Sequence, residues 1–296
     1  MGPHEEGFAM FRICLHQLKL SLLSPKFYIA LMVGVVIQTV TAVPLLEYVK
    51  ATGQPICLVE GYLYYNSDIF SVAAASLGVV LMVSDIPFST QNETYTLMRV
   101  SRKRWIGGKV LYLLCACTIY YLVMFAANAI YMAEYAYWGD FWSQPIYKLV
   151  RDNSGMYRNA FDVSFRYGYL LAEFTPFAAF AVCIGLSISH AFVMSLLLFW
   201  LNLKLPTVLG YFIAIIAHVF NYCLIAVLPL QALQKYSLLA SSCLIYHRFE
   251  AYQDSHRFLT ITQSWLAFAG TAFVLILLTL LAVRKYDFKI TVGTKQ

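Results

Sequence analysis

The chain has 296 residues, of which 60% are hydrophobic and 12% are charged, and its mean hydropathy is +0.67. This composition excludes a soluble globular domain, a disordered chain and a small secreted module held by disulfides. A formal charge of +6 in so apolar a chain does not form the basic face of a nucleic-acid-binding protein. The sequence therefore predicts a polytopic integral membrane protein with membrane lipids, and no nucleic acid, as partners.

Charged residues mark the limits of the membrane-spanning segments, because an ionised side chain at the bilayer centre costs about 2.5–3.5 kcal/mol. Between them lie charge-free runs that can each cross once, since a crossing helix needs about 20 residues. The second run is the shortest, and we expect it to extend into polar residues. The runs are 27–46, 69–84, 110–133, 174–203, 205–234 and 258–283. The predicted fold is all-α, with six transmembrane helices in a single domain over 1–296.

Basic residues concentrate in three segments, 1–26, 85–109 and 284–296, and acidic residues predominate in the segments between them. By the positive-inside rule these three segments are cytoplasmic, and an odd number of spans would place one basic end outside. The prediction is therefore six spans with both termini in the cytoplasm. Pro206 can open a helix at its first turn, which favours an inner turn at Asn202 to Leu205.

The amino terminus is expected to lie along the membrane surface. Residues 1–7 are acidic, which argues against a cleavable signal peptide. Phe8, Phe11 and Leu15 then recur at helical spacing with basic residues on the neighbouring flank. This pattern predicts an amphipathic interfacial helix over 8–24. The alternative is that these residues form the loose first turns of the first span.

The outer segments are 47–68, 134–173 and 235–257, and the middle one is the largest. Its many tyrosines and tryptophans fit an aromatic belt with short interfacial helices, and a ligand-stacking platform is the alternative. Cysteine spacing predicts no metal site. Only Cys57 and Cys243 face outward on this topology, and a disulfide between them is left open.

The segment between spans two and three, 85–109, has the most specific local order in the chain. A polar stretch with one glutamate, 91–96, precedes the basic cluster Arg102-Lys103-Arg104 by one or two helical turns. Anchoring to anionic headgroups explains the positive charge. It does not explain why an acidic stretch comes first.

This order resembles the first cytoplasmic loop of type-2 ABC transporter permeases, in particular those of bacterial peptide, lantibiotic or drug exporters. In that family a glutamate-containing stretch leads into an arginine-rich turn at the start of span three. As architecture, with an interfacial helix and six spans, the resemblance covers the whole chain. The positions that match the motif are Glu93, Arg99, Arg102, Trp105, Gly108 and Lys109.

The resemblance implies that 85–109 is a coupling helix seated in a cleft of a separate nucleotide-binding ATPase subunit. It implies two ATPase copies, a second permease copy or a sister permease, and a bacterial plasma membrane. Glu93 would pair with basic residues of the ATPase, and Arg99 or Arg102 would meet its acidic surface. Lys109 is expected to snorkel at the head of span three.

The chain itself is predicted to be neither an ATPase nor another enzyme. The stretch at Gly107-Gly108-Lys109 lacks the first glycine and the following hydroxyl of a phosphate-binding loop. We therefore expect ATP and magnesium to be bound by the partner subunit, with no cofactor in this chain. The sequence holds no zinc-protease motif and no paired intramembrane aspartates, so we assign no catalytic residues.

An ion-gradient-driven carrier normally needs carboxylates near mid-membrane, and the six runs contain none. That class, and a membrane subunit of a sensory or immunity complex, remain as alternatives to an exporter permease. Polar residues inside the runs are candidates for a substrate path or, alternatively, form ordinary hydrogen bonds between helices. The candidates are Gln38, Thr41, Asn128, His218 and Asn221.

Overall fold

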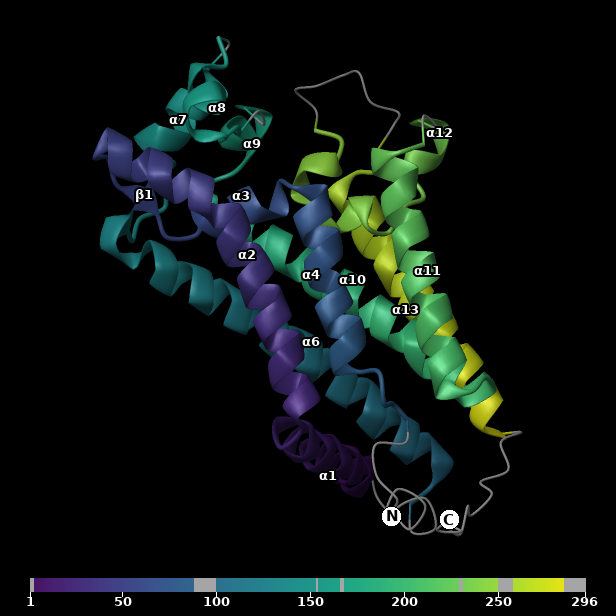
Figure 1. Cartoon of the computed structure of the whole chain (residues 1–296). Helices are drawn as coiled ribbons and strands as arrows, with labels where there is room; N and C mark the ends of the chain where they lie inside the picture. The colour runs from purple at the N-terminus through teal and green to yellow at the C-terminus, as the bar shows by residue number, and fades with distance from the viewer. Residues whose placement is uncertain are drawn as a thin grey trace.

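The computed structural model describes residues 3–87, 100–152, 154–165, 168–228, 231–249 and 258–284. Long helices form a bundle, with one helix lying across one of its ends (Figure 1). The long helices are α1 (Pro3–Leu22), α2 (Pro25–Thr52), α4 (Ile69–Met82), α6 (Arg102–Met132), α10 (Pro176–Lys204), α11 (Thr207–Ala226) and α13 (Ile261–Arg284). We call the end that holds α1, the start of α6 and the end of α13 the inner end, and the opposite end the outer end.

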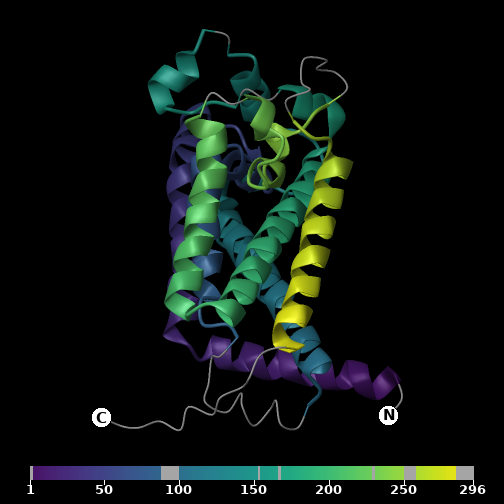
Figure 2. The same cartoon turned by 90° about the vertical axis from the view of Figure 1, so that its right-hand side faces the viewer.

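Within the described residues, five helices are long and apolar enough to cross a membrane: α2, α6, α10, α11 and α13. A sixth span forms if the short helix α3 (Glu60–Asn66) is counted together with α4. The prediction of an all-helical polytopic membrane protein is confirmed. The described helix ends at α1 and α13 lie at the same end of the bundle, as an even number of spans requires (Figure 2).

The second span extends into polar residues, as expected, but the extension is bent. Helices α3 and α4 meet at an angle of 93°. Asp68 begins α4 by accepting hydrogen bonds from the backbone N–H groups of Phe70 and Ser71, which satisfies two orphan donors of the new helix. Every residue of α3 is buried. The polar extension therefore turns into the bundle instead of continuing outward.

Proline and the chain's polar turns set the other helix limits. Pro25 and Pro176 occupy first helical positions, where a missing N–H costs nothing. Helix α10 ends at Lys204 and α11 begins at Thr207, so the inner turn lies at Leu205 and Pro206. The turn predicted at Asn202 to Leu205 was placed too early, because Asn202 to Lys204 still belong to α10. Helix α10 is the central helix, packing against α4, α6, α11 and α13.

Helix α1 lies across the inner end of the long helices, as predicted for an interfacial helix (Figure 2). Cys14 and Gln17 are buried against the bundle. Phe8, Phe11 and Leu15 are exposed, as expected of an apolar helix face that inserts into the bilayer surface.

Small elements fill the outer end (Figure 1). They are β1 (Ile56–Cys57), η1 (Ala133–Tyr135), β2 (Ala136–Tyr137), α7 (Gln144–Val150), α8 (Met156–Phe161), α9 (Gly168–Glu173), α12 (Gln231–Gln234), η2 (Ala240–Ser242) and η3 (Leu244–Tyr246). Strands β1 and β2 pair in parallel, Ile56 with Ala136 and Cys57 with Tyr137, which the sequence did not predict. Cys57 and Cys243 are both free thiols, so the disulfide left open does not form.

Candidate functional site

The candidate site is the inner-end segment between spans two and three, predicted as a coupling loop over 85–109. Its described parts are the turn that follows α4 and the first turns of α6. Glu93 and Arg99 lie outside the described residues.

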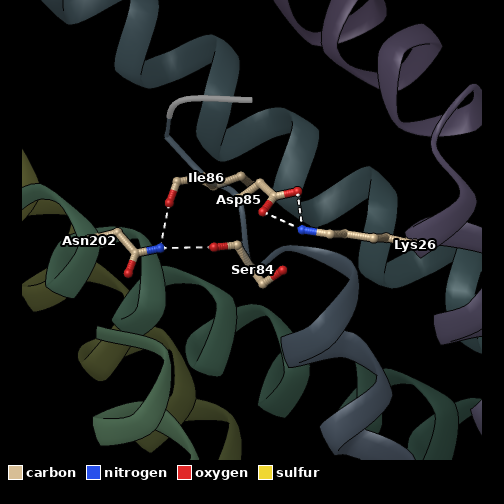
Figure 3. Close-up of polar contacts among 5 residues, drawn as sticks. All are labelled: Lys26, Ser84, Asp85, Ile86 and Asn202. Carbon is tan, nitrogen blue, oxygen red and sulfur yellow. Dashed lines mark hydrogen bonds and ion pairs between the residues drawn. The ribbon is translucent and has the colours of Figure 1, made fainter. Parts of the chain in front are cut away.

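The first end is fixed to α10 and α2 (Figure 3). The Asn202 side-chain Nδ2 donates hydrogen bonds to the carbonyl oxygens of Ser84, at 3.1 Å, and Ile86, at 2.6 Å. Lys26 Nζ lies 2.7 Å and 2.8 Å from the two carboxylate oxygens of Asp85. Side chains of α10 and α2, which are remote in sequence, thus bind the three consecutive residues Ser84 to Ile86.

These contacts of Asn202 and Lys26 follow from the way α4 ends. Beyond Met82 the backbone leaves the helix, and carbonyl groups there need partners other than helical N–H groups. The two N–H bonds of the Asn202 amide supply them from the last turn of α10. Asp85 lies beside the N-terminus of α2, where a negative charge also suits the helix dipole.

The second end is helical, which corrects the predicted boundary. Residues 102–109 form the first two turns of α6, so Arg102, Trp105 and Lys109 are not loop residues. Arg102 Nη1 donates to the Val283 carbonyl oxygen at the end of α13, at 3.0 Å. Trp105 is fully buried, and its ring centroid lies 6.1 Å from that of Phe199 on α10.

Lys109 is fully buried, so the prediction that it snorkels to the headgroups is wrong. Its Nζ donates to Gln17 Oε1 of α1 at 2.6 Å and lies 5.7 Å from the centroid of the Trp105 ring. Gly108 allows α1 this close, because a Cβ there would lie 2.6 Å from Cβ of Ile13. Because Gln17 of α1 supplies a hydrogen-bond acceptor, the Lys109 ammonium group does not have to extend to water.

Together these contacts connect the predicted coupling segment to α1, α2, α10 and α13. Of the predicted coupling residues that the structure describes, Arg102 has an exposed side chain, whereas Trp105 and Lys109 face inward. The inward pair holds the start of α6 in place. Ser101 and Lys103, the neighbours of Arg102, are exposed as well.

Several candidate path residues instead bond to neighbouring elements. The Thr41 and Ser71 hydroxyl oxygens are 2.8 Å apart, joining α2 to α4. His218 Nε2 lies 3.0 Å from the Ser76 hydroxyl and 3.0 Å from the Ala73 carbonyl oxygen, joining α11 to α4. Asn221 Oδ1 accepts from the backbone N–H of Leu238. For these residues the alternative of ordinary helix packing is the better description.

Gln38 on α2 and Asn128 on α6 are different. Each is 1% exposed, and neither side-chain amide has a hydrogen-bond partner among the described residues. The hydroxyl groups of Tyr65 and Tyr121, also buried, are in the same situation. Unpaired buried polar groups are costly, so hydrogen bonding between helices does not account for the side chains of Gln38 and Asn128.

Glu60 is a buried carboxylate that the sequence analysis missed. It is 1% exposed at the start of α3 and accepts from the backbone N–H groups of Cys57, at 2.9 Å, and Ser143, at 2.8 Å. It thereby ties the first outer segment to the second, beside the β1–β2 pair. Its position in the chain, among outer residues, gives no sign of this burial.

Comparisons with protein-family models, with curated proteins and with solved structures give no match. The fold and the helix composition therefore carry the assignment. They show a helical, multi-pass membrane protein whose inner-end segment is anchored at both ends to the rest of the bundle.

Proposed function

We propose that the chain is the membrane-spanning permease subunit of an ABC transporter, driven by a separate ATPase subunit. Its expected cargo is a peptide, a lipid or a hydrophobic drug, and its expected direction is export. The observation that carries the proposal is the double anchorage of the segment between α4 and α6: Asn202 and Lys26 at one end, Lys109 and Arg102 at the other.

A coupling element must pass on a displacement instead of absorbing it. Switching transitions of this kind move packed helices as rigid bodies about an interface. A push on this segment would reach α10 and α2 through Asn202 and Asp85. The same push would reach α1 and α13 through Lys109 and Arg102. A segment that transmits a displacement to the bundle requires such contacts, and an unattached loop would lack them.

Charge supports a protein partner at this place. Arg102 and Lys103 are exposed at the start of α6, and the sequence adds Glu93 and Arg99 nearby. Charges of both signs on one short segment favour a specific orientation of the partner, because they set the register of an interface. Basic residues alone also suit lipid headgroups, so the acidic Glu93 is the part of this charge pattern that favours a protein partner.

Capture of the ATPase tests the proposal. The tagged chain is purified from its native membrane in mild detergent with Mg-ATP, and co-purified proteins are identified by mass spectrometry. The expected result is a nucleotide-binding subunit in stoichiometric amount, lost with Glu93→Lys. Glu47→Lys, the same change at an exposed position on the outer part of α2, is the matched control and should retain it. Failure to capture any nucleotide-binding subunit would contradict the proposal.

A second candidate, an ion-gradient-driven carrier, is favoured by one observation, the buried Glu60 on the bent α3–α4 pair. Buried carboxylates and interrupted helices are typical of proton- and ion-coupled transporters. The purified chain in liposomes with an imposed proton gradient separates the two candidates. Gradient-driven solute uptake without ATPase, abolished by Glu60→Gln, would favour the carrier.

A further inference from the structure

A pocket of about 450 Å³ opens between the inner halves of α6 and α13. Its lining combines two basic residues with apolar ones: Arg102, Lys103, Ile106, Gly107, Val110, Ile276, Leu280 and Val283. We propose that this pocket binds one anionic phospholipid, with an acyl chain between the helices and the phosphate at Arg102 and Lys103. The inference does not require the proposed transport function and holds equally for a carrier. In a transporter the lipid would occupy Arg102 and Lys103, and Glu93 and Arg99 would remain for the ATPase.

The walls suit a hydrocarbon chain. Ile106 and Val110 lie one turn apart on α6, and Ile276 and Leu280 lie one turn apart on α13, so each helix presents a continuous apolar strip. The two helices meet at the inner end and diverge toward the outer end (Figures 1 and 2). The volume is within the usual range of about 300–1,000 Å³ for ligand sites.

The mouth suits a phosphate. Arg102 and Lys103 are exposed on the first turn of α6. The hydrogen bond from Arg102 to the Val283 carbonyl oxygen holds the guanidinium at the junction of the two helices. A guanidinium fork and an ammonium are the usual partners of phosphate oxygens, and the positive N-terminal end of α6 adds to their attraction.

The pocket mouth also lies at the depth of the headgroups. Helix α1 packs on α6 at Gly107 and Gly108, where added Cβ atoms would meet Met10 and Ile13. The exposed apolar stripe of α1 places that helix at the bilayer surface. Basic pockets between transmembrane helices at this depth bind anionic lipid headgroups. A free phosphate would leave the apolar walls uncovered, so the geometry favours the intact lipid.

The test uses the full chain reconstituted in vesicles of equal parts phosphatidylglycerol and phosphatidylcholine, extracted in mild detergent and analysed for retained lipid by native mass spectrometry. The expected result is one retained phosphatidylglycerol and little phosphatidylcholine. Double replacement by Arg102→Gln and Lys103→Gln should lower the retained phosphatidylglycerol about tenfold or more, because each basic residue near the surface contributes to anionic-lipid attraction. The matched control, Arg12→Gln with Lys19→Gln on exposed positions of α1, should retain the lipid.

A second variant separates the pocket from the charges. Leu280→Trp fills the apolar part without altering either basic residue, and it should abolish retention of both lipids. Equal retention of the two lipids by the unaltered chain would overturn the proposal, as would undiminished retention by Leu280→Trp. A truncated variant that lacks residues 285–296 is the last comparison. If only this variant retains phosphatidylglycerol, the pocket belongs to the C-terminal segment of the chain and the proposal is overturned.

Discussion

Asn202 offers the sharpest test of the anchorage, because its one amide group bonds to both the Ser84 and the Ile86 carbonyl oxygens at the start of the coupling segment (Figure 3). Asn202→Leu keeps the size of the side chain and removes both donors. The Ile86 carbonyl belongs to a buried residue, so leaving it unpaired costs about 1–3 kcal/mol. The Ser84 carbonyl is partly exposed and regains water. We therefore expect a loss of about 2 kcal/mol.

The same substitution at Asn128 is the matched control, since that amide is buried but has no partner among the described residues. Asn128→Leu should leave stability unchanged or raise it, because it removes unpaired polar atoms from an apolar interior. Thermal unfolding of both variants in one detergent is the assay. Unchanged stability of Asn202→Leu, or an equal loss with Asn128→Leu, would refute the reasoning.

Three further predictions concern single side chains. Lys109→Met should destabilise the protein by about 1.5–3 kcal/mol and increase proteolysis within α1, because it removes the charged hydrogen bond to Gln17; unchanged cleavage would contradict this. Lys26→Ala should cost less than about 1 kcal/mol in thermal unfolding, since the Lys26 and Asp85 side chains are 52% and 49% exposed. Burial lowers the pKa of His247 to about 4 from 6.5. The unfolded chain therefore binds the extra proton first, and stability should fall by about 3 kcal/mol between pH 6.5 and 4; that loss should shrink with His247→Gln.

The spans were predictable because charge is costly in hydrocarbon, and this single rule located the apolar helices. It failed where a helix continues beyond the bilayer. The run that starts at Val110 marked where charge ends, but α6 begins at Arg102, because basic residues are good helix formers at a membrane surface. The coupling segment was consequently drawn too long at its second end.

Other features depend on contacts between distant residues. Lys109 was expected to reach for water, and only the position of α1 shows that Gln17 supplies an acceptor. Glu60 is buried because backbone donors from two separate outer segments converge on it. The 93° bend after α3 could have been predicted from the sequence. Asp68 is a typical helix N-cap residue, and it accepts from the backbone N–H groups two and three residues later.

The most direct test of the central claim is a cysteine at Ser101, an exposed residue at the start of α6. In sealed inside-out vesicles carrying the native complex, a short bifunctional thiol reagent should crosslink Ser101→Cys to a nucleotide-binding subunit. The same position should resist a membrane-impermeant thiol reagent added outside intact cells. Labelling from outside, or a crosslink pattern without any nucleotide-binding subunit, would contradict the account.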